Sequence, residues 1–213
     1  MRWRAGVPCE RRVAVWMRDL AAALAALLPE AGVGWANPLV TPPGALPVGA
    51  VETRRREFAA GRAAAAQAMA VLGEQGEVGV GDDRAPIWPD GLSGSITHTR
   101  DIALAVVQRG GAIGIDLEPE CSVTPDLWPE ILLPGEMAKP ADATAIFCAK
   151  EAVFKAQYPL TRQMFGFDRI AIALDGQHFT ARFVTETGAI AAGTQWPGHL
   201  IRLHGHILAL CRP

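Results

Sequence analysis

Hydrophobic positions repeat with a helical period in two stretches of the first third of the chain. Residues 12–28 place apolar side chains on one side of a helix, which Pro29 and the glycines after it end. This apolar face consists of Val13, Trp16, Leu20, Leu24 and Leu27. A second helix is predicted from about Glu52 to Leu72, with Thr53 as its N-cap and Gly73 as its C-cap. Its apolar face consists of Phe58, Ala65, Met69 and Leu72.

Short apolar runs bounded by turn residues predict strands in the middle of the chain. A Pro- and Gly-rich connector over residues 38–47 separates the two helices, and residues 73–95 are irregular. Residues 102–107 and 113–117 then read as two strands. The segment Arg109-Gly110-Gly111 between them has the composition of a tight turn. We therefore expect these two strands to form a β-hairpin.

The second half of the chain repeats this plan of helix and hairpins. A loop over residues 119–140 leads into a helix from about Ala143 to Gln157, which Pro159 ends. The remaining strands are predicted as two hairpins, pairing residues 169–174 with 178–184 and residues 199–203 with 206–211. Each half thus contains helices and a small antiparallel sheet, and we predict an α+β fold.

Composition and charge narrow the class of protein. The 213 residues amount to about 1.4 ordinary domains, which indicates one large compact unit or two small halves with a shared core. Half of the residues are hydrophobic and the formal net charge is -2, so a general nucleic-acid-binding surface is not expected. No apolar stretch near the start is long enough to span a bilayer. The cysteines form no CxxC pair, and we expect free thiols in a cytoplasmic protein. They are Cys9, Cys121, Cys148 and Cys211.

Two carboxylates alternate with apolar residues in the segment Gly114-Ile115-Asp116-Leu117-Glu118. Because side chains on a strand alternate between its faces, Asp116 and Glu118 project to the same side. Oxygen ligands at this spacing suit Mg²⁺, which takes one or two carboxylates together with substrate phosphates. A strand end carrying two solvated acids explains the same pattern, so both interpretations stay open at this point.

Three further motifs carry candidate chemistry, each with a plain structural alternative. Glu151 and Lys155 share a helical face, as a surface ion pair or as a third acid beside a phosphate-binding cation. Thr97 and His98 precede a strand, where they bind phosphate or serve the structure alone. Four arginines gather over residues 54–62 of a nearly neutral chain, which indicates an anionic partner or a solvated basic face.

Taken in order, these motifs resemble the 4′-phosphopantetheinyl transferases, in particular the surfactin-type class and its enterobactin synthase component D subgroup. The resemblance runs from about residue 50 to 175. The matching segments are Arg54-x-x-Glu57-Phe58-x-x-Gly61-Arg62, Pro86-Ile87-Trp88-Pro89-x-Gly91-x-x-Gly94-Ser95-Ile96-Thr97-His98, Gly114-Ile115-Asp116-Leu117-Glu118 and Phe147-Cys148-Ala149-Lys150-Glu151-Ala152-x-x-Lys155. The third and fourth segments are the most specific, and their separation of about 30 residues also fits the family.

The resemblance implies a pseudo-twofold α+β fold with two lobes, residues 1–118 and 119–213, and an active site between them. It also implies that coenzyme A donates its phosphopantetheine arm to a serine of an apo acyl, aryl or peptidyl carrier protein. Adenosine 3′,5′-bisphosphate is released. A monomer that works in siderophore or other nonribosomal peptide or polyketide synthesis is expected, and residues 119–140 are either a carrier contact or an ordinary connector.

The family pattern also implies roles for individual residues. Asp116, Glu118 and Glu151 would hold Mg²⁺, with Mn²⁺ as a substitute, and Glu151 is in addition a candidate base for the carrier serine. Asp116 and Lys155 would act at the reacting phosphate. The coenzyme A phosphates would be bound by Arg54, Arg62, Arg84, Thr97, His98 and Lys155. Two alternatives are a non-catalytic module that binds coenzyme A or carrier proteins, and a Mg²⁺-dependent nucleotide phosphohydrolase.

Overall fold

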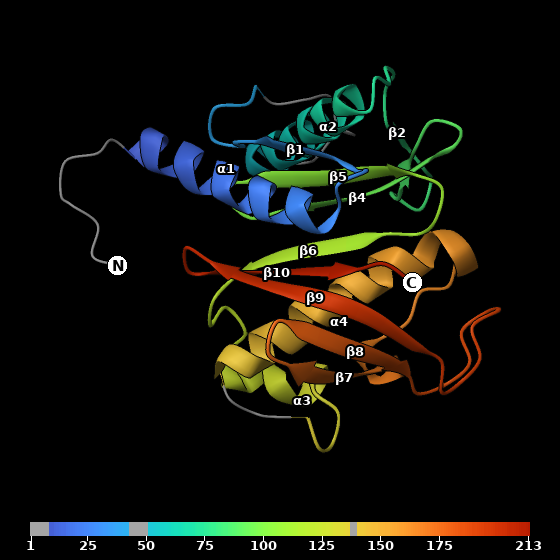
Figure 1. Ribbon diagram of the computed structural model, residues 1–213. Helices are drawn as coiled ribbons and strands as arrows, with labels where there is room; N and C mark the ends of the chain where they lie inside the picture. The colour runs from blue at the N-terminus through green and yellow to red at the C-terminus, as the bar shows by residue number, and fades with distance from the viewer. Residues whose placement is uncertain (1–8, 43–50, 137–139) are drawn as a thin grey trace.

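The computed structural model describes residues 9–42, 51–136 and 140–213, and Figure 1 shows two sheets stacked edge to edge with a helix behind each. The helices are α1 (Cys9–Leu27), α2 (Glu52–Val71), α3 (Trp128–Ile131) and α4 (Pro140–Thr161), with 3₁₀ turns η1 (Pro125–Leu127) and η2 (Phe167–Arg169). The strands are β1 (Gly32–Ala36), β2 (Gly79–Val80), β3 (Pro86–Ile87), β4 (Leu92–His98), β5 (Ala103–Arg109), β6 (Gly114–Pro119), β7 (Ile170–Asp175), β8 (His178–Phe183), β9 (Gln195–Leu203) and β10 (His206–Cys211).

Each described sheet is antiparallel, which confirms the α+β class. The first sheet has the order β1-β5-β4, and the second has the order β6-β10-β9-β8-β7. The short strands β2 and β3 form a separate ribbon. The two hairpins predicted for the second half are confirmed as β7–β8 and β9–β10. The other pairings, such as β1 with β5 and β6 with β10, join strands that are distant in the chain, so they form only as the tertiary structure assembles.

The same connection occurs twice along the chain. In the first half, β1 leads through α2 to β4 and β5, and the sheet order is β1-β5-β4. In the second half, β6 leads through α4 to β9 and β10, and these strands have the order β6-β10-β9. The hairpin β7–β8 extends the second sheet outward from β9. Each half therefore contains the same strand–helix–hairpin connection, although the two sequences are not visibly repeated.

In both halves a strand glycine lies directly on the backbone of the covering helix. A Cβ atom on Gly34 of β1 would collide with the carbonyl oxygen of Ala64 in α2. A Cβ on Gly114 of β6 would likewise collide with the carbonyl oxygen of Ala152 in α4. Because glycine and alanine have the smallest side chains, they allow strand and helix to approach closely. The alanine-rich composition of α2 therefore serves packing rather than helix formation alone.

A continuous apolar core lies between the two sheets and beneath α1. It combines residues from α1, β5, β6 and β10 with the segments that lead into those strands. Its buried members are Met17, Leu20, Leu24, Leu28, Ile102, Leu104, Val106, Ile113, Ile115, Leu117, Leu208 and Leu210. Contacts at the turn between β9 and β10 also hold α1, where Asp19 Oδ2 lies 2.9 Å from His204 Nε2 and Trp16 stacks on His206. The two halves thus share this core.

The predicted hairpin between residues 102–107 and 113–117 is wrong. These segments form β5 and β6, but β5 pairs with β1 and β4, whereas β6 pairs with β10 in the other sheet. Gly110 and Gly111 do adopt positive φ angles of 61° each, so the chain turns there as expected. The turn delivers β6 to the second sheet instead of back onto β5. Strands β1 and β4 were not predicted, because glycine and short polar residues obscure their alternation.

The helix predictions hold in position, with corrections at the faces and ends. Met17 in α1 and Leu28 directly after the helix are buried with Leu20 and Leu24, whereas Leu27 is 39% exposed. Thr53 is not the N-cap of α2, because Val51 occupies that position without a side-chain hydrogen bond. The C-cap of α2 is Leu72, and the predicted C-cap Gly73 follows it with φ +74°. Helix α4 continues through Pro159 to Thr161, so the predicted end at Pro159 falls short by two residues.

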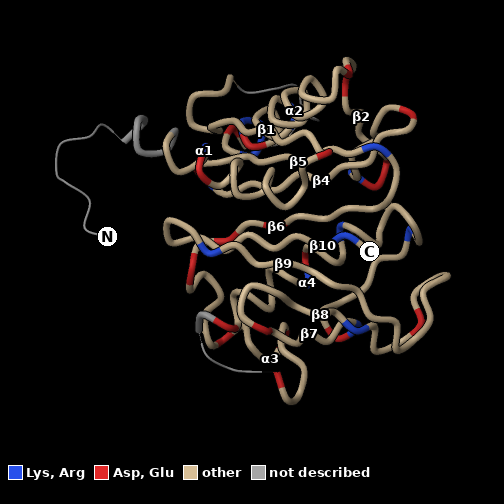
Figure 2. The backbone as a smooth tube through the Cα atoms, in the orientation of Figure 1, with Lys and Arg blue, Asp and Glu red and all other residues tan. Residues whose placement is uncertain are grey.

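Some sequence predictions concern residues that the structure does not describe, and others can be compared with it. The side chains of Cys9 and Val13, residues 43–47 of the 38–47 connector and residues 137–139 of the 119–140 loop are not described. Cys121, Cys148 and Cys211 are free thiols, as expected. Within the described segments, the helices are too short or too polar to cross a bilayer. Figure 2 shows acidic and basic positions in both halves, in keeping with the small net charge.

Candidate active site

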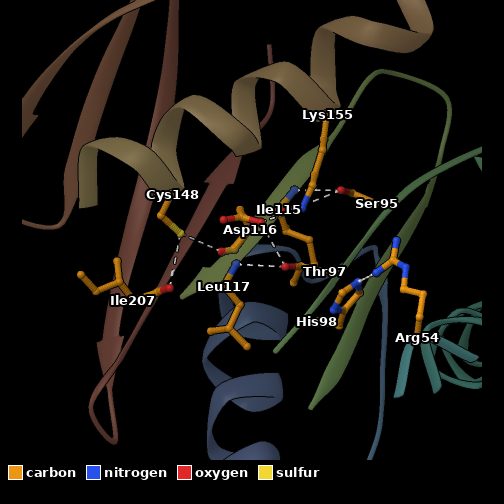
Figure 3. Close-up of polar contacts among 10 residues, drawn as sticks. All are labelled: Arg54, Ser95, Thr97, His98, Ile115, Asp116, Leu117, Cys148, Lys155 and Ile207. Carbon is orange, nitrogen blue, oxygen red and sulfur yellow. Dashed lines mark hydrogen bonds and ion pairs between the residues drawn. The ribbon is translucent and has the colours of Figure 1, made fainter. Parts of the chain in front are cut away.

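Strands β4 and β6 lie side by side at the seam between the two sheets, and side chains connect them in place of a backbone ladder. The amide of Ile115 donates to Ser95 Oγ at 3.0 Å, and the amide of Leu117 donates to Thr97 Oγ1 at 3.1 Å. Thr97 Oγ1 in turn donates to Asp116 Oδ1 at 3.1 Å (Figure 3). These contacts satisfy backbone amides of β6 that its sheet partner β10 leaves free, and they orient Asp116.

Asp116 and Lys155 form a close ion pair across this seam. Lys155 Nζ donates to Asp116 Oδ1 at 2.6 Å and to the carbonyl of Ile115 at 3.2 Å (Figure 3). Burial lowers the pKa of Lys155, but the nearby carboxylate of Asp116 more than offsets this, so the pKa lies above its ordinary value. Lys155 is therefore a fixed cation. The second carboxylate oxygen of Asp116, Oδ2, is buried and has no hydrogen-bond partner.

Glu118 and Glu151 have raised pKa values because burial and like charge both penalise their ionised forms. Burial, followed by the charge of Asp116, raises the pKa of Glu118 to about 7. Burial raises the pKa of Glu151, Lys155 lowers it and Asp116 raises it further. The three carboxylates thus lie close enough to repel one another, and Lys155 supplies only part of the positive charge that would relieve the repulsion.

This donor set fits a divalent cation. Asp116 Oδ2 is a buried acceptor without a partner, and the raised pKa of Glu118 means that its ionised form is disfavoured. A divalent cation bound by these oxygens would favour the ionised carboxylates. In the described parts of the chain, no three acidic, histidine or cysteine side chains are already arranged as a complete metal site. The side chains of the predicted metal ligands Asp116, Glu118 and Glu151 would therefore have to draw together around an ion.

A polar cluster at the end of β4 holds His98 neutral. Arg54 Nη1 lies 2.8 Å from His98 Nε2, and because a guanidinium can only donate, the ring proton is assigned to Nδ1. Burial lowers the pKa of His98, the charge of Glu57 raises it and Arg54 lowers it again. Glu57 Oε2 also accepts from Arg54 Nη1 at 3.3 Å. Arg54, His98 and Glu57 thus form one charged edge beside the seam.

Arg62 presents a partly buried cation whose polar atoms are incompletely satisfied. Its guanidinium carbon lies 4.8 Å from the ring centroid of Phe58, and its Nη1 is buried without a hydrogen-bond partner. Burial lowers the pKa of Arg62, although a guanidinium stays charged at neutral pH. An unsatisfied buried donor with a full charge is a ready site for an anion.

A cavity of about 950 Å³ opens over these groups. Its lining includes every predicted site residue except Glu151, namely Arg54, Arg62, Arg84, Thr97, His98, Asp116, Glu118 and Lys155. Glu151 lines a smaller adjoining cavity of about 260 Å³ instead. Phe154 and Met164 line both cavities and form the partition between them. The size and mixed lining of the larger cavity suit a ligand as big as a nucleotide cofactor.

Sequence reasoning missed a contact at the outer end of the larger cavity. Tyr158 Oη donates to Asp83 Oδ2 at 2.7 Å, and Arg162 Nη1 lies 3.3 Å from the same oxygen. This contact joins the β2–β3 ribbon to the end of α4. Tyr158 could have been found, because it follows Lys155 by three positions on the same helix. Asp83 stands in an irregular loop, and Arg162 lies beyond Pro159, the residue expected to end the helix, so neither carried a signal.

Comparison with known families agrees with the α+β fold. The model of the 4′-phosphopantetheinyl transferase N-terminal domain matches residues 45–108, and the model of the 4′-phosphopantetheinyl transferase superfamily matches residues 112–211. The chain belongs to the 4′-phosphopantetheinyl transferase superfamily. Within it, similarity to proteins named enterobactin synthase component D confirms the predicted subgroup.

Three relatives show how far this similarity extends. The chain is 40% identical over 136 residues to 4′-phosphopantetheinyl transferase Npt of Nocardia iowensis, covering 59% of this chain and 61% of the relative. It is 38% identical over 149 residues to 4′-phosphopantetheinyl transferase PptT of Mycobacterium tuberculosis, covering 63% and 66%. With enterobactin synthase component D of Salmonella typhi the identity is 35% over 158 residues, covering 67% of each chain. The matches thus span roughly two thirds or less of these relatives.

Proposed function

We propose that this protein transfers the phosphopantetheine arm of coenzyme A to a serine of an apo carrier protein and releases adenosine 3′,5′-bisphosphate. The observation that carries the proposal is the Lys155–Asp116 pair, which lines one cavity together with Arg54, Arg62 and His98. Such a cavity offers cations for several phosphates and carboxylates for one metal ion. Phosphoryl transfer needs mainly this combination of positioning and charge stabilisation.

The cationic side chains of the cavity take the phosphate groups of coenzyme A. We assign the 3′-phosphate to Arg54 and Arg62, because the buried Nη1 of Arg62 lacks a partner. His98, whose Nδ1–H is left to donate, and Thr97 take pyrophosphate oxygens, and Arg84 adds charge at the cavity wall. Lys155 contacts the phosphate at the bond that breaks, where its fixed positive charge stabilises the transition state.

Asp116, Glu118 and Glu151 are the proposed ligands of Mg²⁺, and Mn²⁺ would be accepted at the same oxygens. When bound, the ion would neutralise charge on the pyrophosphate. Glu151 also lines the smaller cavity, and we assign it the proton of a serine that approaches from that side. Burial, which raises the pKa of Glu151, makes it a stronger base than an exposed carboxylate.

The setting of this activity belongs to the same proposal. We propose a cytoplasmic monomer whose carrier proteins are those of siderophore, other nonribosomal peptide or polyketide synthesis. Free Cys121, Cys148 and Cys211 support a reducing compartment. We retain the division into lobes 1–118 and 119–213 as a proposal, with the qualification that β6, at the end of the first lobe, pairs with β10 of the second. Residues 119–140 are the proposed carrier contact.

One experiment tests the activity. The protein is mixed with coenzyme A, Mg²⁺ and apo carrier proteins from several pathways, and each carrier is followed by intact mass. We expect a gain of one phosphopantetheinyl group, its loss on addition of EDTA and its return with Mg²⁺ or Mn²⁺. Glu151→Gln serves as the inactive control, with an unchanged far-UV spectrum.

Other outcomes point to other functions. If no carrier gains mass while coenzyme A binds, the protein is a binding module and the proposal fails. Release of adenosine bisphosphate in the absence of any carrier would indicate a phosphohydrolase. Transfer that continues in EDTA would contradict the three-carboxylate site while leaving the transferase activity in place.

A further inference from the structure

Lys150 precedes Glu151 on α4, yet its ammonium group is enclosed by protein atoms. Lys150 Nζ donates to the carbonyl of Ile131 at 2.7 Å, to Glu136 Oε2 at 2.9 Å and to the carbonyl of Phe167 at 3.0 Å. An ammonium group has three protons, so these acceptors use all of its donors. Lys150 therefore has no proton left for a ligand, in contrast to Lys155.

Both carboxylate oxygens of Glu136, the partner of Lys150, accept hydrogen bonds from backbone amides. The amide of Leu133 donates to Oε2 at 2.5 Å, and the amide of Ile172 donates to Oε1 at 2.8 Å. Lys150 and Glu136 together thus connect three separate segments: the end of α3 with the turn after it, helix α4, and η2 with the start of β7.

The pair is more deeply buried than stability alone explains. The side chains of Lys150 and Glu136 are 1% and 5% exposed. Taking two charges out of water costs about as much as their attraction returns, so well-packed apolar residues often stabilise such a position equally well. A role for the pair is therefore to be sought in the geometry that its directional hydrogen bonds impose.

That geometry concerns the smaller cavity beside Glu151. Lys150 and Glu151 line this cavity from α4, and Phe165, Gly166 and Phe167 form its opposite wall. Lys150 holds the carbonyl of Phe167, so one side chain fixes the distance between the helix that carries Glu151 and the wall that faces it. Ring contacts of Phe167 with Phe147 and of Phe165 with Phe154 continue the same wall.

We propose that Lys150 and Glu136 form a positioning pair that sets Glu151 and the wall of residues 165–167 at the separation that the transfer reaction requires. This inference rests on the proposed function. The pair does not touch coenzyme A, because it lies outside the larger cavity. Its loss should therefore slow turnover without weakening the binding of coenzyme A.

Three variants separate positioning from plain structural support. Lys150→Met and Glu136→Gln each remove one partner and leave the other buried, so both lower the melting temperature. The double variant Lys150→Met/Glu136→Gln leaves no buried charge, so its melting temperature should exceed that of either single variant. It should stay below that of the wild type, because the amide oxygen of Gln can accept from only one of the Leu133 and Ile172 amides. The hydrogen bonds to Ile131 and Phe167 stay lost in the double variant. Arg56→Ala, which breaks an exposed pair with Glu52 on α2, is the matched control.

We expect the double variant to retain the wild-type Kd for coenzyme A within about twofold and to lose at least about tenfold in kcat. Amides of residues 164–170 should exchange faster with solvent deuterium than in the wild type, whereas Arg56→Ala changes neither readout. Recovery of kcat together with the melting temperature in the double variant would show that the pair only supports the fold. A wild-type protein without transferase activity would instead refute the proposed function and leave the exchange result as the test of the pair.

Discussion

Asp116 receives hydrogen bonds from two elements that belong to different halves of the molecule. Thr97 of β4 and Lys155 of α4 both donate to its Oδ1. Cys148 donates a weaker hydrogen bond to its backbone carbonyl at 3.1 Å. Its remaining oxygen is buried and unsatisfied. Replacing a single charged side chain should therefore change the stability of the protein or its binding of an anion.

Glu118→Gln should stabilise the metal-free protein at neutral and higher pH. Glu118 has its pKa raised from 4.5 to about 7 by burial and by Asp116, so the folded protein binds its proton more tightly than the unfolded chain. Stability is therefore lost as pH rises from about 4.5 to 7. With allowance for solvent screening of this half-buried group, we expect the variant to gain about 1–2 kcal/mol at pH 8 and nothing near pH 4.

Thermal unfolding in EDTA at several pH values measures this gain, and exposed Glu52→Gln is the control. Mg²⁺ should raise the melting temperature of the wild type more than that of Glu118→Gln. A variant less stable than the wild type at pH 8 in EDTA would mean that the Glu118 carboxylate is not under repulsion.

Arg62→Ala should raise the KM for coenzyme A by about tenfold, the effect of losing a charged hydrogen bond. The KM for 3′-dephospho-coenzyme A should rise much less, because the lost guanidinium would have no phosphate to bind. Steady-state kinetics with both donors measures the difference, and Arg56→Ala on the same helix controls for charge alone. Equal increases with the two donors would rule out the 3′-phosphate assignment.

At the scale of elements, strand–helix contact in each half depends on a glycine. Gly114→Ala should destabilise the protein by about 2 kcal/mol or more, because the new methyl group would collide with the carbonyl oxygen of Ala152 and α4 would have to shift. Chemical denaturation measures the loss. Gly79→Ala in the exposed ribbon is the milder comparison, because its Cβ would meet Ile87 Cβ at 3.3 Å, a tight contact that a small shift of the exposed Ile87 can relieve. Similar losses in both variants would contradict the proposed role of the close approach.

The elements with strong local signals could be predicted from the sequence, and those that depend on distant partners could not. The helices α1, α2 and α4 and the two C-terminal hairpins follow from periodicity and turn residues. The β5–β6 hairpin failed because Gly110 and Gly111 specify a turn but not the sheet that receives β6. Burial of β6 between β4 and β10 decides that choice, and burial is a property of the assembled core.

Most of the residues proposed for the site line the larger cavity together, and their motifs could be found in the sequence because each motif is contiguous in the chain. The motifs also place Glu151 with the other acids, but the structure places it in the adjoining cavity. Which side of Phe154 it faces depends on how α4 is rotated against β6. That rotation is set by the close approach of Gly114 to α4 and by the hydrogen bonds of Lys150. Neither contact can be predicted from the spacing of residues in the sequence.

At the scale of the whole molecule, the two sheets should unfold together. The core between them combines α1, β5, β6 and β10, so neither sheet keeps its buried face when the other is lost. We expect one urea transition, with far-UV circular dichroism and tryptophan fluorescence giving the same midpoint. Two separate transitions would mean that each half is stable alone. The six tryptophans of the chain make fluorescence a sensitive probe.

Tyr158, whose hydroxyl group holds Asp83 at the outer end of the large cavity, is the single tyrosine of the chain. Biosynthetic labelling with fluorotyrosine would consequently give the protein one fluorine resonance, from a side chain that lines the large cavity. Its chemical shift would report the entry of coenzyme A directly, without a mutation or an attached dye. The molecule thus carries its own spectroscopic marker, and titrations of substrate analogues could be followed by one-dimensional NMR at the mouth of the cavity.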